Sequence, residues 1–317
     1  MSKYRFLRGR KAVYAVLLLI MLLIISLSMV LFAQVFSYGL TADTMLLSAP
    51  EGPEKIRLSW TEDTQSTMTI TWQDSPDTAA AWIEYAAGED IPPGVGPNDD
   101  PGGQVIRADA KLVEHQSLLS DGGTQWTVTL YDLEPGTYAY RLYGGKETGM
   151  VEDSSAVCHF SVPDNTADEA VSFAYFGDVQ VVSDAEGEYT RWGKMAQDAY
   201  FRNPDIDFGI MAGDIVESGI STEQFDWFFD AASPVFSSIP LFSAIGNHES
   251  NFLSGKPELY LDSFVFPENG PDGFSEEFYS FDDGPAHILV LNSWVFSGEQ
   301  KLSDAIMQRS GNGYAGI

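Results

Sequence analysis

Cysteine is almost absent from this sequence, and basic residues are scarce. Its 317 residues include one cysteine, Cys158, so an intrachain disulfide is impossible and cysteine-based zinc sites are excluded. Lys and Arg together number 17 against 46 Asp and Glu, which gives a formal net charge of −29. A body this acidic does not bind nucleic acid by neutralising phosphates, and anionic lipid repels it. Hydrophobic residues are nonetheless 44% of the chain, which excludes disorder throughout, and the length predicts about two domains.

Charged residues are also lacking from residues 12–36, and all the charges that precede this segment are basic. As a helix at ~1.5 Å per residue the segment would extend about 37 Å, which is enough to cross a bilayer. The basic cluster predicts that residues 1–11 lie in the cytoplasm and that the body lies outside. We therefore expect residues 1–39 to form a basic tip and a single-pass transmembrane anchor in the cell membrane. The alternative is a cleaved signal peptide and a secreted body, but the apolar segment exceeds the usual length of roughly 7–15 residues.

Residues 53–163 carry only β-strand patterns. Short runs rich in β-branched and aromatic residues alternate with turn residues, as in an antiparallel sandwich. Within residues 67–73 apolar and polar side chains alternate, which predicts one buried face and one solvated face. Leu133 is followed by Pro135-Gly136 and then Tyr138, which predicts a turn whose tyrosine bonds back to the corner. The block resembles a fibronectin type III domain. The strands are expected at residues 55–60, 67–73, 81–85, 104–109, 126–130, 137–143 and 158–162.

After a polar linker, residues 170–317 change to alternating strand and helix patterns. Buried-type strands are expected at residues 171–176, 208–211, 241–245 and 286–291, with helices at 190–203 and 222–236. Strand–helix–strand order implies parallel pairing with right-handed crossovers. The whole chain is therefore expected to be multidomain, with an N-terminal transmembrane helix, an all-β sandwich and an α/β domain.

Three of these strands run into a glycine followed by polar side chains. The motifs are Gly177-Asp178-Val179-Gln180, Gly213-Asp214-Ile215-Val216-Glu217 and Gly246-Asn247-His248-Glu249. Sites in α/β sheets lie at the carboxyl ends of the strands. Oxygen donors with one imidazole suit divalent or trivalent metal ions. Each motif alone is typical of a turn or a helix cap, but the three in order predict a metal site.

These motifs resemble those of the calcineurin-like metallophosphoesterases, in the purple-acid-phosphatase-like branch with an N-terminal fibronectin-like domain. The resemblance covers residues 53–293 and implies a four-layer αββα domain with two metal ions, Fe, Mn or Zn. It implies that Asp178 binds the first metal, that Asp214 bridges both and that Asn247 binds the second. It also implies that His248 is catalytic, donating a proton to the leaving group after a metal-activated hydroxide attacks phosphorus.

Two positions depart from the family pattern. Many relatives have a histidine two places after the first aspartate, where this chain has Gln180, either a metal ligand or a residue that supports one. Purple members have a tyrosine three places after the second aspartate, where this chain has Glu217, so a purple colour is not expected. We expect Glu217 to be either a replacement metal ligand or a solvated or helix-capping acid, and the second role is favoured.

The family's later histidines lack counterparts in this sequence. The only histidine after His248 is His287, which falls inside an expected strand and favours a structural role. We therefore expect residues 170–317 to be only the N-terminal part of a phosphoesterase domain, from a longer gene product or a decayed homologue. The expected function is acid-phosphatase-like hydrolysis of phosphate esters at the outer face of a membrane, with this chain inactive without the missing half. The alternatives are a non-catalytic surface protein with a vestigial phosphoesterase half, and a phosphodiesterase or nuclease. No nucleic acid partner is expected.

Overall fold

The computed structural model describes residues 52–91, 105–113, 123–148, 150–164, 170–181, 186–251 and 254–294, together with Met21. The chain divides into two compact units, residues 1–47 and residues 48–317, and the second is described here. The expected transmembrane anchor lies, Met21 apart, outside the described residues. Within the parts of the chain that the structure describes, no helix combines the length and hydropathy that crossing a bilayer requires.

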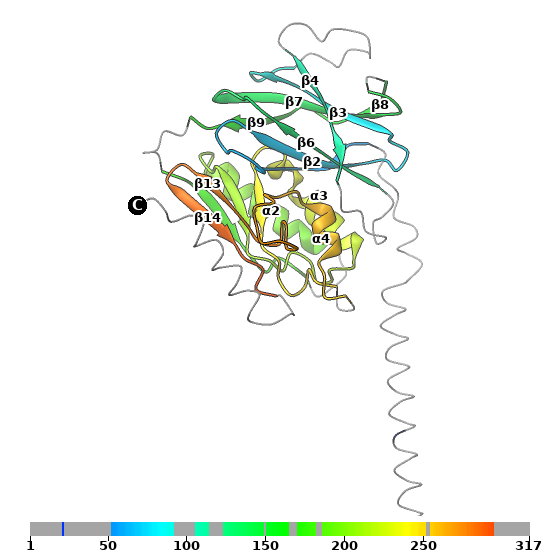
Figure 1. The fold of residues 1–317 in the computed structure, drawn as a ribbon, viewed down its shortest axis with the longest axis vertical. Coiled ribbons are helices and arrows are strands. Elements are labelled where there is room, and N and C mark those ends of the chain that lie inside the picture. Colours follow the sequence, from blue (N-terminus) through cyan, green and yellow to red (C-terminus); the bar gives the residue numbers. More distant parts are fainter. Residues whose placement is uncertain are drawn as a thin grey trace, which may run out of the picture. The chain divides into compact units, whose positions relative to one another are not determined.

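The first part of the second unit is an antiparallel β-sandwich (Figure 1). One sheet has the order β1-β2-β6-β5, with β1 at Glu54–Ser59, β2 at Met68–Asp74, β6 at Thr124–Leu130 and β5 at Lys111–Leu112. The other has the order β4-β3-β7-β8, with β4 at Ile106–Asp109, β3 at Ala80–Ala87, β7 at Gly136–Gly145 and β8 at Val151–Ser154. Strand β9, Cys158–Val162, also pairs with β7. The seven expected strands are confirmed, whereas the short or exposed β5 and β8 were not predicted.

The expected tyrosine corner is present between β6 and β7. The hydroxyl of Tyr138 donates to the carbonyl oxygen of Glu134 at 3.0 Å and accepts from the Glu134 backbone N–H at 2.9 Å. Leu133, directly before this turn, is buried in the sandwich core. The turn therefore closes as the sequence predicts, with one tyrosine hydroxyl bonding both backbone polar groups of Glu134.

The prediction of a solvated polar face on β2 is wrong. Thr69, Thr71 and Gln73 are all buried. They are satisfied across the sheet, where Thr69 Oγ1 lies 2.9 Å from Thr129 Oγ1 and Gln73 Oε1 accepts from Gln125 Nε2 at 3.1 Å. Alternation shows which side chains share a face, but it does not show what covers that face.

Contacts from β1 show what covers this polar face. Lys55 Nζ bonds both Gln73 on β2, at 2.8 Å, and Asp226 on α3, at 2.5 Å. Arg57 Nε donates to the carbonyl oxygen of Ser263 on α4. The guanidinium carbon of Arg57 lies 4.7 Å from the centre of the Phe229 ring on α3. The polar face of the sheet is thus the face that packs against the α/β part.

The α/β part contains a parallel sheet with crossover helices (Figure 1). Its strand order is β10-β11-β12, with β10 at Phe173–Phe176, β11 at Phe208–Met211 and β12 at Leu241–Ser243. The connections are α2, Glu186–Arg202, and α3, Thr222–Phe236, which pack through stacked Trp192 and Phe228 at 5.4 Å between ring centroids. Helix α3 begins where Ser221 caps it, its side chain accepting from Gln224 N. The parallel pairing of the first three strands is confirmed.

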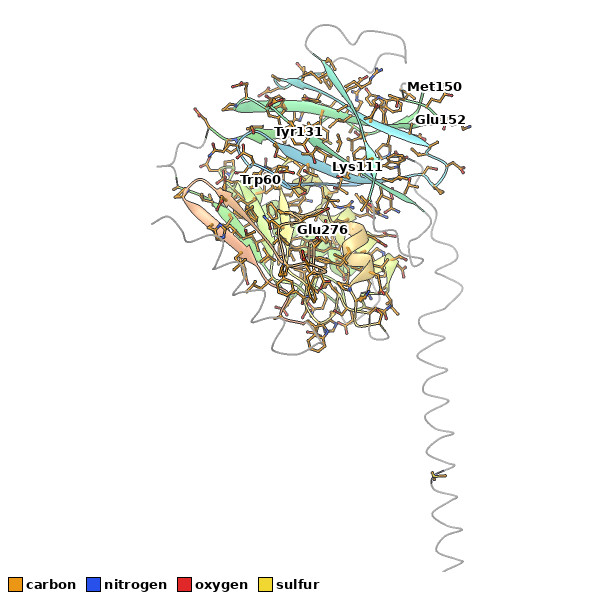
Figure 2. The ribbon with its side chains drawn as sticks, viewed as in Figure 1. Trp60, Lys111, Tyr131, Met150, Glu152 and Glu276 are labelled. Atoms are coloured by element: carbon orange, nitrogen blue, oxygen red, sulfur yellow. The ribbon has the colours of Figure 1, made fainter. Side chains whose placement is uncertain are left out.

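The fourth expected strand does not join this sheet in the described residues. It is β14, Ala286–Val290, and it pairs antiparallel with β13, Tyr279–Asp283. A tight turn at Gly284, with φ 52°, joins the two into a hairpin. Upstream, the buried Glu276 accepts from Phe266 N at 2.8 Å and ties the segment after α4, Glu258–Ser263, to the approach to β13 (Figure 2).

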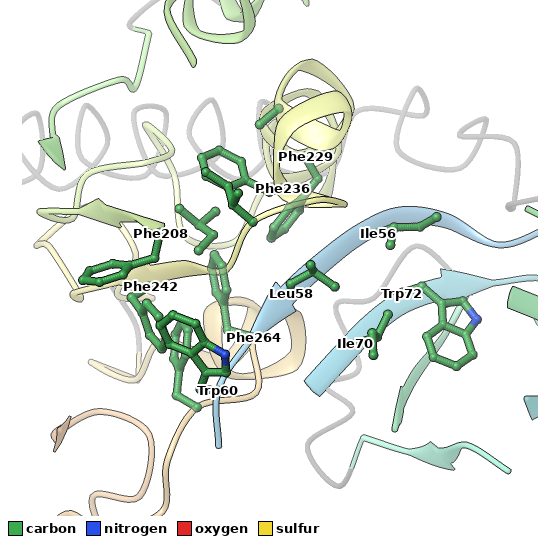
Figure 3. Close-up of a cluster of buried hydrophobic side chains, with 14 of the residues drawn as sticks. Ile56, Leu58, Trp60, Ile70, Trp72, Phe208, Phe229, Phe236, Phe242 and Phe264 are labelled. Atoms are coloured by element: carbon green, nitrogen blue, oxygen red, sulfur yellow. The ribbon is translucent and has the colours of Figure 1, made fainter. Parts of the chain in front are cut away.

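One tryptophan makes the sandwich and the α/β part share a core. Trp60 follows β1 directly and lies against Phe208 of β11 and Phe242 of β12, at 5.7 Å between centroids in each case (Figure 3). Phe281 of β13 stacks on Phe242 at 3.9 Å and completes the cluster. Because Trp60 is fully buried, the chain directly after β1 packs into the core of the α/β part, while β1 itself pairs within the sandwich.

Candidate metal centre

The three polar motifs form three loops at one edge of the parallel sheet. The first loop (residues 177–180) follows β10, the second (213–217) follows β11 and the third (246–249) follows β12. Parallel register, with Phe176 beside Met211 and Met211 beside Ser243, brings their carboxyl ends together. All six expected site residues therefore lie in neighbouring loops: Asp178, Gln180, Asp214, Glu217, Asn247 and His248.

Hydrogen bonds join each loop to the next. Asp178 N donates to Gly213 O at 3.4 Å, and Gln180 N donates to Asp214 O at 3.1 Å. On the other side, His248 N donates to the carboxylate oxygen Oδ1 of Asp214 at 3.2 Å. The second loop is thus the centre of the group, and Asp214 contacts both neighbouring loops.

The backbone is strained at both aspartates. Asp178 and Asp214 each have φ 52°, in the left-handed region. For a residue with a Cβ this conformation costs on the order of 1–2 kcal/mol, and it persists where the surroundings enforce it, often at functional sites. The Asp214 carboxylate also lies close to the backbone of Gly246. A Cβ at position 246 would lie 2.1 Å from Asp214 Oδ1, so only glycine leaves room for this carboxylate.

A buried acid, Glu249, holds the second and third loops together. Its carboxylate accepts from the backbone N–H groups of Asp214 at 2.9 Å, Ile215 at 2.8 Å and Gly246 at 2.6 Å. Burial raises the pKa of Glu249, and these three hydrogen bonds oppose that shift. The third motif includes Glu249, but the sequence alone assigns this residue no role, because nothing in the motif shows that the acid is buried.

His248 is oriented by Glu217. The ring nitrogen Nδ1 of His248 lies 2.8 Å from the carbonyl oxygen of Glu217, so Nδ1 carries a proton and Nε2 is left for chemistry. The pKa of His248 is raised, first by this hydrogen bond and further by the carboxylates of Asp214, Glu217 and Glu249, although partial burial opposes the rise. The backbone N–H of Glu217 in turn donates to Gln224 Oε1 on α3 at 2.8 Å. Glu217 thus positions the histidine through its main chain.

The donor atoms in these loops fit an oxygen-coordinated metal ion. Asp178 and Asp214 offer carboxylates, and Asn247 and Gln180 offer amide oxygens. The Gln180 oxygen Oε1 is buried and accepts no hydrogen bond, which is rare in a native structure unless an ion or water is the partner. Among the described residues no group of three or more His, Cys, Asp or Glu side chains is arranged to hold a metal, and only two of these donors are of those types.

His287 is not part of the three loops. It lies on the exposed β14, where Nδ1 contacts Asp282 Oδ1 of β13 at 2.5 Å. A cross-strand pair of this kind is a local contact of the hairpin, which agrees with the expected structural role.

A cavity of about 620 Å³ lies elsewhere, at the amino ends of β11 and β12. Asp205, Asp207 and Pro240 line it, together with His159 and Phe160 of β9. None of the expected site residues contributes to its wall. The cavity and the three loops are therefore at opposite ends of the parallel sheet.

Comparison with known proteins defines the class. Residues 171–305 match the family described as "Calcineurin-like phosphoesterase". Residues 53–162 match "Purple acid Phosphatase, N-terminal domain". Successive parts of the chain therefore match a purple acid phosphatase N-terminal domain and a calcineurin-like phosphoesterase domain, as the motifs predict.

Two relatives show how far the similarity extends. A segment of 77 residues is 32% identical to purple acid phosphatase 13 of Arabidopsis thaliana, covering 23% of this chain and 14% of that protein. The structure of purple acid phosphatase PPD1 from yellow lupin (Lupinus luteus) seeds has a TM-score of 0.61 at 20% identity, covering 83% of this chain and 49% of that chain. At this identity the structural match shows the fold. The chain spans about half the length of the solved relative.

Proposed function

We propose that this protein hydrolyses phosphate esters, as an acid-phosphatase-like phosphomonoesterase, at the edge formed by the three loops. The observation that carries the proposal is the pair of left-handed aspartates, Asp178 and Asp214, in loops that hydrogen bonds join. Strain of this kind costs stability and is typical of active sites and ligand-binding loops. The net charge of −29 disfavours nucleic acid and favours small phosphomonoesters over a nuclease substrate.

Each loop has a part in the proposed reaction. The chemistry that metal ions supply when bound is activation of water and neutralisation of charge on the phosphoryl group. Asp178, Asp214 and Asn247 would hold these ions, Asp214 as the bridging ligand. His248 would face the leaving group with Nε2, because Nδ1 is held by the Glu217 carbonyl. In its doubly protonated form, which the raised pKa of His248 favours, the ring would give the Nε2 proton to the departing oxygen and keep the Nδ1 proton.

Aryl phosphate hydrolysis with added manganese, iron or zinc tests this function. The protein to assay is the product of the reading frame that contains this chain. We expect metal-dependent turnover, abolished in Asp214→Ala and lowered about 10²–10⁴-fold in His248→Ala. Turnover that survives Asp214→Ala would contradict the proposal, and its absence throughout would favour a non-catalytic surface protein.

We further propose that the body lies outside the cell, anchored by residues 12–36. The support is the charge-free segment and the basic residues before it. Protease added to intact cells should digest the body and leave residues 1–11 protected. A body that survives until the cells are lysed would contradict this orientation.

A further inference from the structure

Gln180 carries a buried polar atom that the protein itself does not satisfy. Its amide oxygen Oε1 is buried and has no hydrogen-bond partner. Native structures rarely leave such an atom unpaired, and an ion or water that completes it is among the usual reasons. The backbone of Gln180 places this side chain in the first loop, two residues after Asp178.

The surroundings of Gln180 hold that loop firmly. Its backbone N–H donates to the carbonyl oxygen of Asp214 at 3.1 Å, so the main chain of Gln180 touches the main chain of the residue that would bridge the metals. The intervening Val179 packs against the hydrophobic core. Asp178, on the other side of Val179, has the left-handed φ of 52° that Asp214 also has. The amide therefore belongs to a rigid loop and not to a mobile surface segment.

We propose that Gln180 Oε1 is a metal ligand and that, with Asp178 and Asp214, it forms an all-oxygen donor set for the first metal. The inference rests on the proposed function, which requires a metal at these loops. Carboxylate and amide oxygens are the ligands of hard cations such as Mn²⁺, whereas imidazole suits Zn²⁺ and Fe. Zn²⁺ binds a given set of ligands more tightly than Mn²⁺, but an all-oxygen set makes this difference in affinity smaller than it is in a site with histidine in this place.

The test is Mn²⁺ and Zn²⁺ binding by the 317-residue chain, with free Mn²⁺ followed by electron paramagnetic resonance and Zn²⁺ measured by competition. Gln180→Leu removes the oxygen at similar size, and we expect Mn²⁺ affinity to fall by at least about 10-fold. Gln180→Glu keeps an oxygen and should restore or strengthen Mn²⁺ binding. Gln180→His should bind metal but shift the preference toward Zn²⁺. The matched control is Gln65→Glu, an equal charge change at an exposed glutamine of the sandwich, which should leave both affinities unchanged.

Thermal unfolding of the metal-free variants separates ligation from a structural role. Because the oxygen has no partner to lose, Gln180→Leu should unfold at the wild-type temperature or above it, even though its Mn²⁺ affinity falls. Should Gln180→Leu fail to fold, the shift in Mn²⁺ to Zn²⁺ preference between Gln180→Glu and Gln180→His decides the matter. Wild-type affinity retained in folded Gln180→Leu, or no shift in preference, would overturn the inference. Loss of binding in Asp214→Asn alone would then leave the proposed function standing. A wild-type chain that binds neither metal would overturn the inference, and the aryl phosphate assay would still decide the proposed function.

Discussion

The carboxylate of Glu249 accepts a hydrogen bond from the backbone N–H of Asp214 at 2.9 Å. The same carboxylate also accepts from Gly246, which begins the third loop. One side chain thus fixes the distance between the strand ends of β11 and β12. It also leaves Asp214 Oδ1 facing His248 N, so the loop that carries the predicted bridging carboxylate is set before any metal binds.

Replacing Glu249 by glutamine should destabilise the protein. The amide nitrogen of Gln cannot accept, so at least one buried backbone N–H of Asp214, Ile215 or Gly246 would lose its partner. A buried donor left unsatisfied costs about 1–3 kcal/mol, and we expect that decrease in the free energy of unfolding. Denaturant unfolding of Glu249→Gln measures it, with Glu268→Gln at an exposed position as the control. A variant as stable as the wild type would show that the carboxylate does not hold the loops.

The raised pKa of His248 predicts a pH dependence of stability. The folded-state pKa lies above the unfolded value of about 6.5, so the protonated ring stabilises the fold below that pH, and this contribution is lost as pH rises through the folded pKa. In chelator-treated protein, the stability difference between wild type and His248→Asn should therefore shrink above about pH 6.5. Unfolding curves at a series of pH values measure this difference. A difference that stays constant or grows with pH would mean that the Glu217 carbonyl does not favour the protonated ring.

Arg57 should be among the more sensitive positions in the sandwich. Its guanidinium is buried and bonds the carbonyl oxygens of Ser263 and Lys55 and the side chain of Gln125. Arg57→Ala leaves these acceptors without a donor, and we expect the free energy of unfolding to fall by roughly 3 kcal/mol. Arg202→Ala, on an exposed helix end, is the control and should change stability by less than about 1 kcal/mol. Equal effects of the two substitutions would contradict the role of β1 as a shared element.

How much the sequence predicts depends on where the deciding contacts lie. The strand β11 and the helix α3 were predicted to the residue, because both follow from local patterns in the chain. The buried polar face of β2 was not predicted, because α3 and α4, which cover it, lie about 150–190 residues further along the chain. Strand β14 was placed beside parallel strands because β13 was not recognised as its partner.

The candidate site shows the same division between local and distant signals. The motifs identify Asp178, Asp214, Asn247 and His248, since a glycine and a polar residue after a strand are visible in sequence. The three N–H bonds of Glu249 and the unpaired oxygen of Gln180 depend on loops from different strands. No pattern in one segment reports a contact of that kind.

Glu217 predicts the colour of the iron form. The residue stands where purple members of the family have a tyrosine, and a carboxylate gives no phenolate-to-iron charge transfer. Iron-loaded protein should therefore lack the broad visible band, and Glu217→Tyr should introduce it, as an absorption spectrum would show. The Glu217→Phe variant, with a ring but no phenol, is the control and should stay colourless. Strong visible absorption of the unsubstituted iron protein would contradict the assignment of Glu217 to this position.

Anomalous diffraction from crystals of the 317-residue chain grown with Mn²⁺ tests the central claim most directly, because it locates the metal without depending on activity. The account predicts a manganese peak at the carboxyl end of the parallel sheet, with carboxylate oxygens of Asp178 and Asp214 at about 2.0–2.6 Å. A crystal whose only manganese peak lies elsewhere, for example beside Asp205 and Asp207 in the cavity at the amino ends of β11 and β12, would contradict it.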